Sequence, residues 1–128
     1  IKYGGNCWFY LKVVYINMLY DLAEKLGCDW SVIESSLSAD PRIGPTHLSP
    51  VHRGGPDAIA PIEHQSSGKR GAGGHCFIKD FAALDELYRR ELGDDSAGRE
   101  VLRALASKNI ELLKESGKDL DLLKEVYG

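Results

Sequence analysis

The pattern of hydrophobic and polar positions predicts a chain built of helices. From about Asn6 to Leu26 there is no glycine or proline, and apolar residues fall on nearly every side of a helix. We therefore expect a long helix that is buried on several sides and ended by Gly27. At roughly 1.5 Å per residue it would be about 30 Å long. Covering so much apolar surface points to a second subunit.

Four shorter helices are expected after this one. Apolar residues recur at spacings of three and four in each, and turn or capping residues separate them. No segment alternates between apolar and polar positions for long enough to predict a strand. We therefore expect an all-α domain with a long central helix and about four shorter ones. The boundary residues are Asp29 and Asp40-Pro41, Cys76 and Gly93, Asp94-Asp95-Ser96 and Gly117, and Asp119 to Tyr127.

The segment from Pro41 to Gly74 has a different character. It holds all five prolines and three of the four histidines, and it lacks helical periodicity. We interpret most of it, from about residue 45 to 74, as one long loop. A loop of that length is more often functional than merely connective.

Composition narrows the class of protein. A length of 128 residues fits a single domain spanning 1–128, and a net charge of −3 gives no electrostatic footprint for nucleic acid. The longest apolar stretch, Cys7 to Tyr20, is interrupted by Lys12 and Asn17, which disfavours a membrane span. Three irregularly spaced cysteines suit a reducing compartment, so we expect a cytoplasmic protein. From the start at Ile1, without an initiating Met, we expect that an upstream domain precedes this chain.

A glycine-rich loop delivers Cys76 to the start of a predicted helix. The segment reads Gly71-Ala72-Gly73-Gly74-His75-Cys76-Phe77-Ile78-Lys79-Asp80. The free N–H groups and dipole of a helix N-terminus favour a thiolate anion there. Lys79 and Asp80 follow at spacings of three and four, which returns them to the face that carries Cys76. A reactive thiol and a structural cysteine fit this local pattern about equally well.

Other sites fit less well. The glycines lack the third position of a dinucleotide fingerprint, and Gly68-Lys69-Arg70 lacks the rest of a phosphate-binding loop. His75 beside Cys76 has no flanking signature of a cysteine hydrolase. The histidines at 47, 52, 64 and 75 lack the paired spacing of a zinc site, so we expect no metal. Lys2 and Asn6 lie four residues apart and share a face if the helix begins there; otherwise they are an exposed lysine and an N-cap.

Three motifs taken in order resemble one family. Lys2-Tyr3-Gly4-Gly5-Asn6 resembles Lys-Leu-x-x-Asn, with a further Asn17 on the long helix, and Asp40-Pro41-Arg42-Ile43-Gly44-Pro45 resembles Asp-x-Arg-Ile-Gly. Gly71 to Asp80 is similar to Gly-Phe/Tyr-Gly-Gly-x-Cys-Phe-x-Lys-Asp. These are motifs of the UDP-glucose/GDP-mannose dehydrogenases, in the central dimerisation domain that carries the catalytic cysteine. The resemblance covers about the first ninety residues and implies a helical fold like the C-terminal domain of 6-phosphogluconate dehydrogenases.

The resemblance implies a reaction and catalytic roles. The family oxidises a UDP- or GDP-hexose to the uronic acid with NAD, through a thiohemiacetal and a thioester on the cysteine. Cys76 would be that nucleophile. Lys2 would stabilise oxyanions and Asn6 would align a water or the reacting oxygen. Asp80 would assist proton transfer to and from the water.

The resemblance also implies binding partners. Lys79 would lie near NAD, which an upstream domain would mainly bind, so that the isolated chain is expected to be inactive. Ser49 and the loop Gly71, Ala72 and Gly73 would contact the nucleotide sugar. Arg42 would reach a substrate held mainly by the neighbouring subunit, within a homodimer formed through the long first helix.

The chain departs from the family pattern at three places. Ala72 stands where an aromatic residue is usual, and Tyr10 where a small residue is common. About eighteen additional residues, from about Val51 to Arg70, lie within the substrate loop. These departures leave open which sugar is used. They also keep open a non-catalytic helical dimerisation module derived from the same family.

Overall fold

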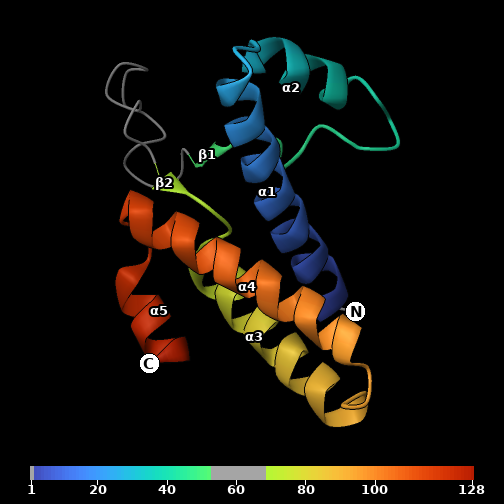
Figure 1. The fold of residues 1–128 in the computed structure, drawn as a ribbon, viewed down its shortest axis with the longest axis vertical. Coiled ribbons are helices and arrows are strands. Elements are labelled where there is room, and N and C mark those ends of the chain that lie inside the picture. Colours follow the sequence, from blue (N-terminus) through green and yellow to red (C-terminus); the bar gives the residue numbers. More distant parts are fainter. Residues whose placement is uncertain (1, 53–68) are drawn as a thin grey trace.

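The computed structural model describes residues 2–52 and 69–128, so the middle of the predicted inserted loop lies outside the described residues. Within these ranges the chain forms five helices and one short two-stranded ladder (Figure 1). The prediction of an all-α domain with a long first helix is confirmed. The elements are α1 (Lys2–Lys25), α2 (Trp30–Ser38), β1 (Val51–His52), β2 (Lys69–Arg70), α3 (Gly74–Glu91), α4 (Ser96–Ser116) and α5 (Leu120–Tyr127).

Helix α1 begins one turn earlier than the sequence predicts. It starts at Lys2 rather than near Asn6 and includes Gly4 and Gly5, both of which are exposed. Each glycine costs a helix interior about 1 kcal/mol relative to alanine, a cost that packing of the remaining helix can offset. Because α1 contains both residues, Lys2 and Asn6 lie one turn apart on the same face.

Capping residues account for most of the other helix boundaries. Asp29 accepts a hydrogen bond from Ser31 N at the start of α2, and Asp95 accepts one from Gly98 N at the start of α4. Gly117 ends α4 in the left-handed conformation that glycine adopts without steric cost. These boundaries agree with the sequence prediction.

The segment from about residue 45 to 74, predicted as one long loop, contains a short ladder in its described parts. Val51 pairs with Arg70 and His52 with Lys69 in an antiparallel ladder, and α3 begins at Gly74. Each strand has only two residues, which is too short for a period of two to show in the sequence. The ladder brings the residues on either side of 53–68 together.

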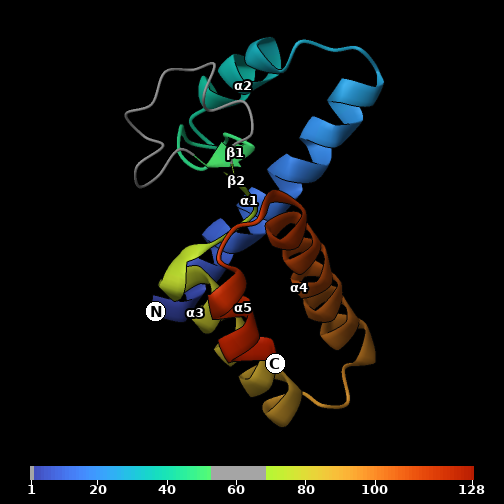
Figure 2. The same cartoon turned by 90° about the vertical axis from the view of Figure 1, so that its left-hand side faces the viewer.

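The main core lies where α1 crosses α3 and α4 (Figure 2). Tyr10 of α1 stacks on Phe81 of α3 with ring centroids 3.9 Å apart and planes 5° apart. Tyr10 is only 1% exposed, so this departure from the family pattern faces the core of the domain itself. A smaller cluster joins Ile78 of α3 to Leu113 of α4 and Leu123 of α5. Both clusters contain α3, which holds that helix in place from two sides.

Within residues 2–52 and 69–128, none of the helices is both long enough and apolar enough to span a bilayer.

Candidate active site

Cys76 lies in the first turn of α3 and is exposed to solvent. Gly73 is the N-cap of this helix and has no side chain with which to accept a hydrogen bond from the first turn. The predicted location of the thiol, at a helix N-terminus after a glycine-rich loop, is therefore present in the structure. Asp80 lies one turn further along α3, on the same face as Cys76.

A hydrogen bond joins the first motif of the sequence to the third. The side-chain amide of Asn6 on α1 donates to Asp80 Oδ2 at 2.7 Å. Asp80 is 7% exposed, whereas Asn6 is half-buried, so this bond lies at the edge of the core. Lys2 lies one turn before Asn6 and Cys76 one turn before Asp80. Of these four residues, only Asn6 and Asp80 are hydrogen-bonded to each other in the described part of the chain.

The neighbouring thiol of Cys7 has a different environment. Cys7 is buried in the core beside Asn6, and burial followed by the negative charge of Asp80 raises the pKa of its thiol to about 11. Cys7 is therefore protonated at neutral pH. Of the two thiols near Asp80, only that of Cys76 is open to solvent.

A cavity of about 810 Å³ lies beside the glycine-rich loop. Four of the five predicted substrate contacts line it, namely Ser49, Gly71, Ala72 and Gly73. The wall is completed by Val13 of α1, residues of helix α2, most of the segment 45–51, Phe77 and Lys118. Its size falls within the range of small-molecule sites. The segment after α2 and the cysteine loop, which are far apart in sequence, thus share one concave surface.

Asn109 of α4 holds the glycine-rich loop, and the sequence analysis did not identify it. Its side-chain oxygen accepts from Ala72 N at 2.6 Å, and its side-chain amide donates to Ala72 O at 2.8 Å. Both residues are 1% exposed. A Cβ on Gly71, whose φ is +101°, would lie 3.1 Å from Asn109 Oδ1. An asparagine on an apolar helix face was the available signal for this contact.

Arg42 does not line the cavity. It is 88% exposed and forms an ion pair with Asp40 at 2.7 Å. Hydrogen bonds from Arg42 hold the pKa of the Asp40 carboxyl below its usual value. The turn that carries Arg42 is attached to α1, because buried Lys12 donates to Ile43 O at 2.9 Å. Arg42 thus projects from an anchored turn toward solvent.

The second asparagine of the long helix, Asn17, binds the strand that leads into the cysteine loop. Arg70 of β2 donates to Asn17 Oδ1 at 2.8 Å and to Asp21 at 2.9 Å. Its guanidinium also lies 5.1 Å from the centre of the Tyr20 ring. Arg70 therefore attaches one end of the inserted segment to α1.

The histidines and Lys79, the remaining candidate residues, lie in different parts of the chain. His47 stacks on Phe9 of α1, with ring centroids 4.2 Å apart, and lies beside Phe77 of α3. Burial and then the charge of Lys12 lower the pKa of His47. His64 lies outside the described residues, and no group of three or more potential metal ligands occurs in the rest. Lys79 forms an ion pair with Glu125 of α5 at 3.2 Å.

Comparison with known proteins identifies a family whose sequence pattern covers the helices, the loop and the cysteine described above. The pattern described as "UDP-glucose/GDP-mannose dehydrogenase family, central domain" matches residues 1–109. The chain belongs to this family, and the matched part is its central domain. The predicted resemblance is confirmed, and the match extends beyond the ninety residues in which the motifs lie.

Several relatives are UDP-glucose 6-dehydrogenases. That of Rickettsia bellii (strain RML369-C) is 29% identical over 136 residues, covering 99% of this chain and 27% of the relative. The enzyme of Rickettsia typhi (strain ATCC VR-144 / Wilmington) is 33% identical over 104 residues, covering 81% of this chain and 20% of the relative. The enzyme of Rhizobium meliloti (strain 1021) is 34% identical over 84 residues, covering 66% of this chain and 15% of the relative. The chain thus spans about a quarter or less of these relatives. No solved structure matches it significantly.

Replacing Asn109 with leucine tests the contact that holds the loop. Asn109→Leu keeps a side chain of similar size but leaves the N–H and C=O of Ala72 buried without partners. We expect the free energy of unfolding to fall by about 2–6 kcal/mol, since each of the two unpaired buried groups costs about 1–3 kcal/mol. Chemical denaturation followed by circular dichroism measures the change.

Ser107→Ala, at an exposed position on the same helix, is the matched control and should change stability by less than about 0.5 kcal/mol. Equal stabilities for Asn109→Leu and the control would contradict the importance of the Asn109 contact.

Proposed function

We propose that this chain is the central domain of an NAD-dependent nucleotide-sugar 6-dehydrogenase that oxidises a UDP- or GDP-hexose to the uronic acid. The observation that carries the proposal is the Asn6–Asp80 hydrogen bond, which links the helix face of Lys2 and Asn6 to the face of Cys76 and Asp80. Membership of the family and the cavity beside the cysteine loop support it.

Cys76 acts as the nucleophile in this proposal. Its thiolate adds to the aldehyde carbon, and the carbonyl oxygen takes up a proton, to give a thiohemiacetal. The oxidations of alcohol to aldehyde and of thiohemiacetal to thioester would each use NAD as the hydride acceptor. Water then cleaves the thioester to the acid and the free thiol. Lys2 stabilises the negative charge that develops on the oxygen. Asp80 accepts a proton from the attacking water, and Asn6 orients the Asp80 carboxylate through the bond at 2.7 Å.

The substrate occupies the cavity in this proposal. Ser49 and the loop Gly71, Ala72 and Gly73, which line the cavity, contact the nucleotide sugar. Cys76 is not among the residues that line the cavity, so the reacting carbon would extend past Gly73 to reach the thiol three residues further on. Ala72 presents only a methyl group, so the loop offers no aromatic surface against the sugar. Arg42, which projects from its anchored turn, reaches the substrate of a neighbouring subunit.

NAD does not fit the residues described here. Dinucleotides bind at the carboxyl edge of a parallel sheet, and residues 2–52 and 69–128 contain only the two-residue antiparallel pair β1–β2. We propose that the cofactor is bound mainly by an upstream domain, that Lys79 lies at the edge facing it, and that this chain alone is inactive. We also propose a cytoplasmic location, which the three irregularly spaced cysteines support.

The catalytic assignment can be tested in a chimeric enzyme. The chain replaces the matching segment of the Rickettsia bellii relative, and NADH formation is measured with UDP-glucose and GDP-mannose. We expect turnover with one of them, and Cys76→Ser should lower it by about a hundredfold or more because the covalent intermediate is lost. Cys28→Ser, at an exposed cysteine outside the site, should leave the rate within about twofold.

An inactive chimera that is folded, or one whose activity survives Cys76→Ser, would contradict the assignment and favour a non-catalytic dimerisation module.

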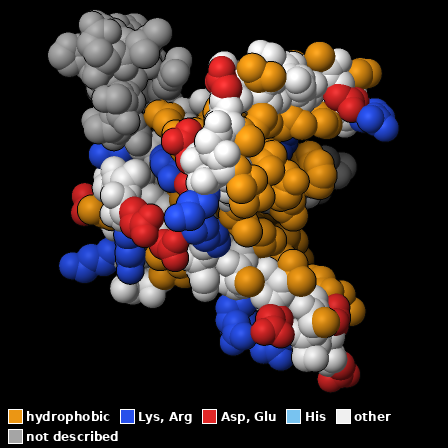
Figure 3. All heavy atoms as spheres, turned by 45° about the horizontal axis from the view of Figure 1, so that its top comes forward, with side chains coloured by type: hydrophobic (Ala, Val, Ile, Leu, Met, Phe, Trp, Pro, Cys, Tyr) orange, Lys and Arg blue, Asp and Glu red, His pale blue; other side chains and the backbone are white. Residues whose placement is uncertain are grey.

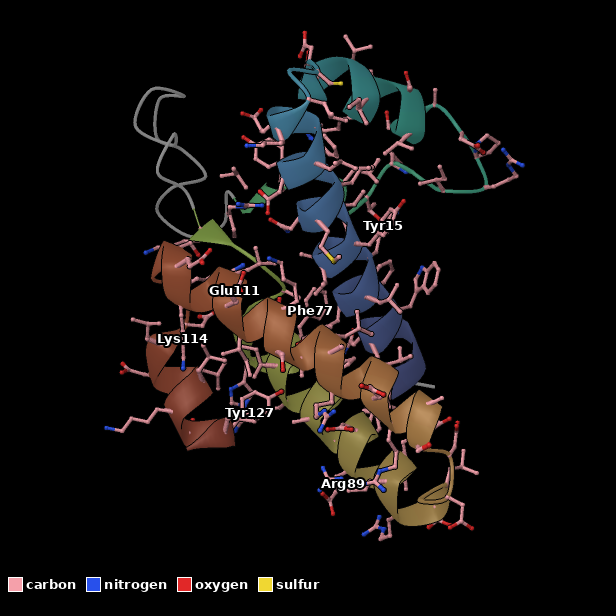
Figure 4. The ribbon with its side chains drawn as sticks, viewed as in Figure 1. Tyr15, Phe77, Arg89, Glu111, Lys114 and Tyr127 are labelled. Atoms are coloured by element: carbon pink, nitrogen blue, oxygen red, sulfur yellow. The ribbon has the colours of Figure 1, made fainter. Side chains whose placement is uncertain are left out.

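We further propose that the protein is a homodimer formed through α1. Large apolar side chains are exposed along this helix at spacings of three and four, a pattern that forms one continuous stripe. Hydrophobic side chains gather in one large area in Figure 3, and Tyr15 lies on the side of α1 turned away from α4 (Figure 4). The stripe consists of Trp8, Leu11, Tyr15, Met18, Leu22 and Leu26.

An apolar stripe of this length is unusual on the surface of a monomeric protein. The 24 residues of α1 make a helix roughly 36 Å long, and Trp8 in the stripe is 60% exposed. Contiguous apolar patches of this kind mark protein–protein interfaces. A second copy of α1 presents the same stripe, so packing across a two-fold axis would cover both.

Met18→Glu tests the dimer, because it places a charge in the middle of the stripe. Light scattering at micromolar concentration should give the mass of a dimer for the native chain and of a monomer for Met18→Glu. Val101→Glu, at an exposed apolar position on α4, is the matched control and should remain dimeric. A monomeric native chain would overturn the proposal.

A further inference from the structure

Two consecutive residues of the turn between α4 and α5, Lys118 and Asp119, contact the glycine-rich loop. The ammonium of Lys118 donates to Gly71 O at 2.9 Å, and Asp119 Oδ2 accepts from Gly74 N at 2.7 Å. A Cβ on Gly73 would collide with Lys118 Cε and Asp119 Oδ2. The two side chains therefore pack directly on the loop, and a larger residue at position 73 would displace them. Both residues lie beyond the part of the chain that the family pattern matches.

Asp119 replaces the capping side chain that α3 lacks. Gly73, the N-cap of α3, has no side chain, and the carboxylate of Asp119 binds the N–H of the first helical residue instead. Asp119 is also the N-cap of α5, yet its side chain makes no capping bond to its own helix. Its φ of 52° is one of two positive values among the described non-glycine residues. A left-handed backbone at a non-glycine residue is a cost that surrounding contacts must offset.

Lys118 is unusually buried for a lysine. It is 7% exposed, and burial lowers the pKa of its amine to about 8. Its bond to Gly71 O satisfies a carbonyl that faces the cavity wall. Buried lysines are rare unless they bind a partner, and the described partner here is the loop backbone.

We propose that Lys118 and Asp119 are positioning residues, which fix the backbone from Gly71 to Gly74 and thereby the location of the Cys76 thiol. Cys76 follows Gly74 by two residues within the same first turn of α3, so a shift of Gly74 moves it directly. This inference rests on the proposed function, because it gives Cys76 the role of nucleophile. It adds the C-terminal turn of the domain to the site.

A pair of substitutions at Asp119 isolates the hydrogen bond from the charge. Asp119→Asn keeps an oxygen acceptor for Gly74 N, whereas Asp119→Gly removes the acceptor and accepts the left-handed backbone without strain. Both lack the carboxylate charge, so a difference between them reports the bond. Circular dichroism first establishes that both variants are folded.

Two measurements on the full chain then test the proposal. Amide hydrogen exchange followed by NMR should be about fivefold or more faster at Gly74 in Asp119→Gly than in Asp119→Asn. Iodoacetamide labelling, read by peptide mass spectrometry, should modify Cys76 at rates that differ by about threefold or more between the two variants, because loss of the bond to Gly74 moves the first turn that carries Cys76. Exposed Cys28 should react equally in both variants.

A second variant tests the other half of the turn. Lys118→Met keeps a buried unbranched side chain but removes the hydrogen bond to Gly71 O. The rate of amide hydrogen exchange at Ala72 and Gly74 should therefore rise. Lys124→Met, at an exposed position on α5, is the control and should leave it unchanged.

Equal exchange at Gly74 in the two Asp119 variants would overturn the proposal. Faster exchange in Asp119→Gly with unchanged labelling of Cys76 relative to Cys28 would overturn the positioning role. A native Cys76 that reacts no faster than Cys28 would instead count against the catalytic role of Cys76, and the exchange comparison would still decide whether the turn holds the loop.

Discussion

The fixed backbone of the glycine-rich loop is the constraint on which the rest of the site depends. A loop rich in glycine has high conformational freedom, and its buried polar groups need partners. Asn109 binds both backbone groups of Ala72, and the turn after α4 binds the carbonyl of Gly71 and the N–H of Gly74. Helix α3 can then begin at one defined point. The cavity, the exposed thiol of Cys76 and the core around Phe81 all follow from that starting point.

Helix α1 has one face buried against the rest of the domain and one face exposed to solvent. One face packs in the core through Tyr10 and binds the other elements through Asn6, Lys12 and Asn17. The opposite face presents the apolar stripe. Continuous apolar character along this helix thus reflects one buried face and one exposed face within a single chain. The anchored turn of Arg42 is attached to the same helix, so a dimer formed through α1 would hold its two sites in a fixed relation.

Helix boundaries were predictable because their signals are local. Asp29, Asp95 and Gly117 act within one turn of their own position, and each lies where the sequence indicates. The pairing of Asn6 with Asp80 was not derivable from spacing, since 74 residues separate them; only the resemblance to a family placed both in one site. Asn109, Lys118 and Asp119 were missed because their partners are backbone atoms of a loop far away in the sequence. Only Asn109 left a signal, as a polar residue on an apolar helix face. The β1–β2 ladder was missed because two-residue strands are too short to show alternation.

The covalent role of Cys76 is the central claim, and mass spectrometry of the chimeric enzyme tests it most directly. Asp80→Asn should slow cleavage of the thioester by water, so that an acyl group accumulates during turnover with the nucleotide sugar and NAD. The account predicts a peptide containing Cys76 that carries the mass of the substrate acyl group, with no such addition at Cys28. Turnover without any adduct on Cys76, or an adduct on another residue, would contradict it.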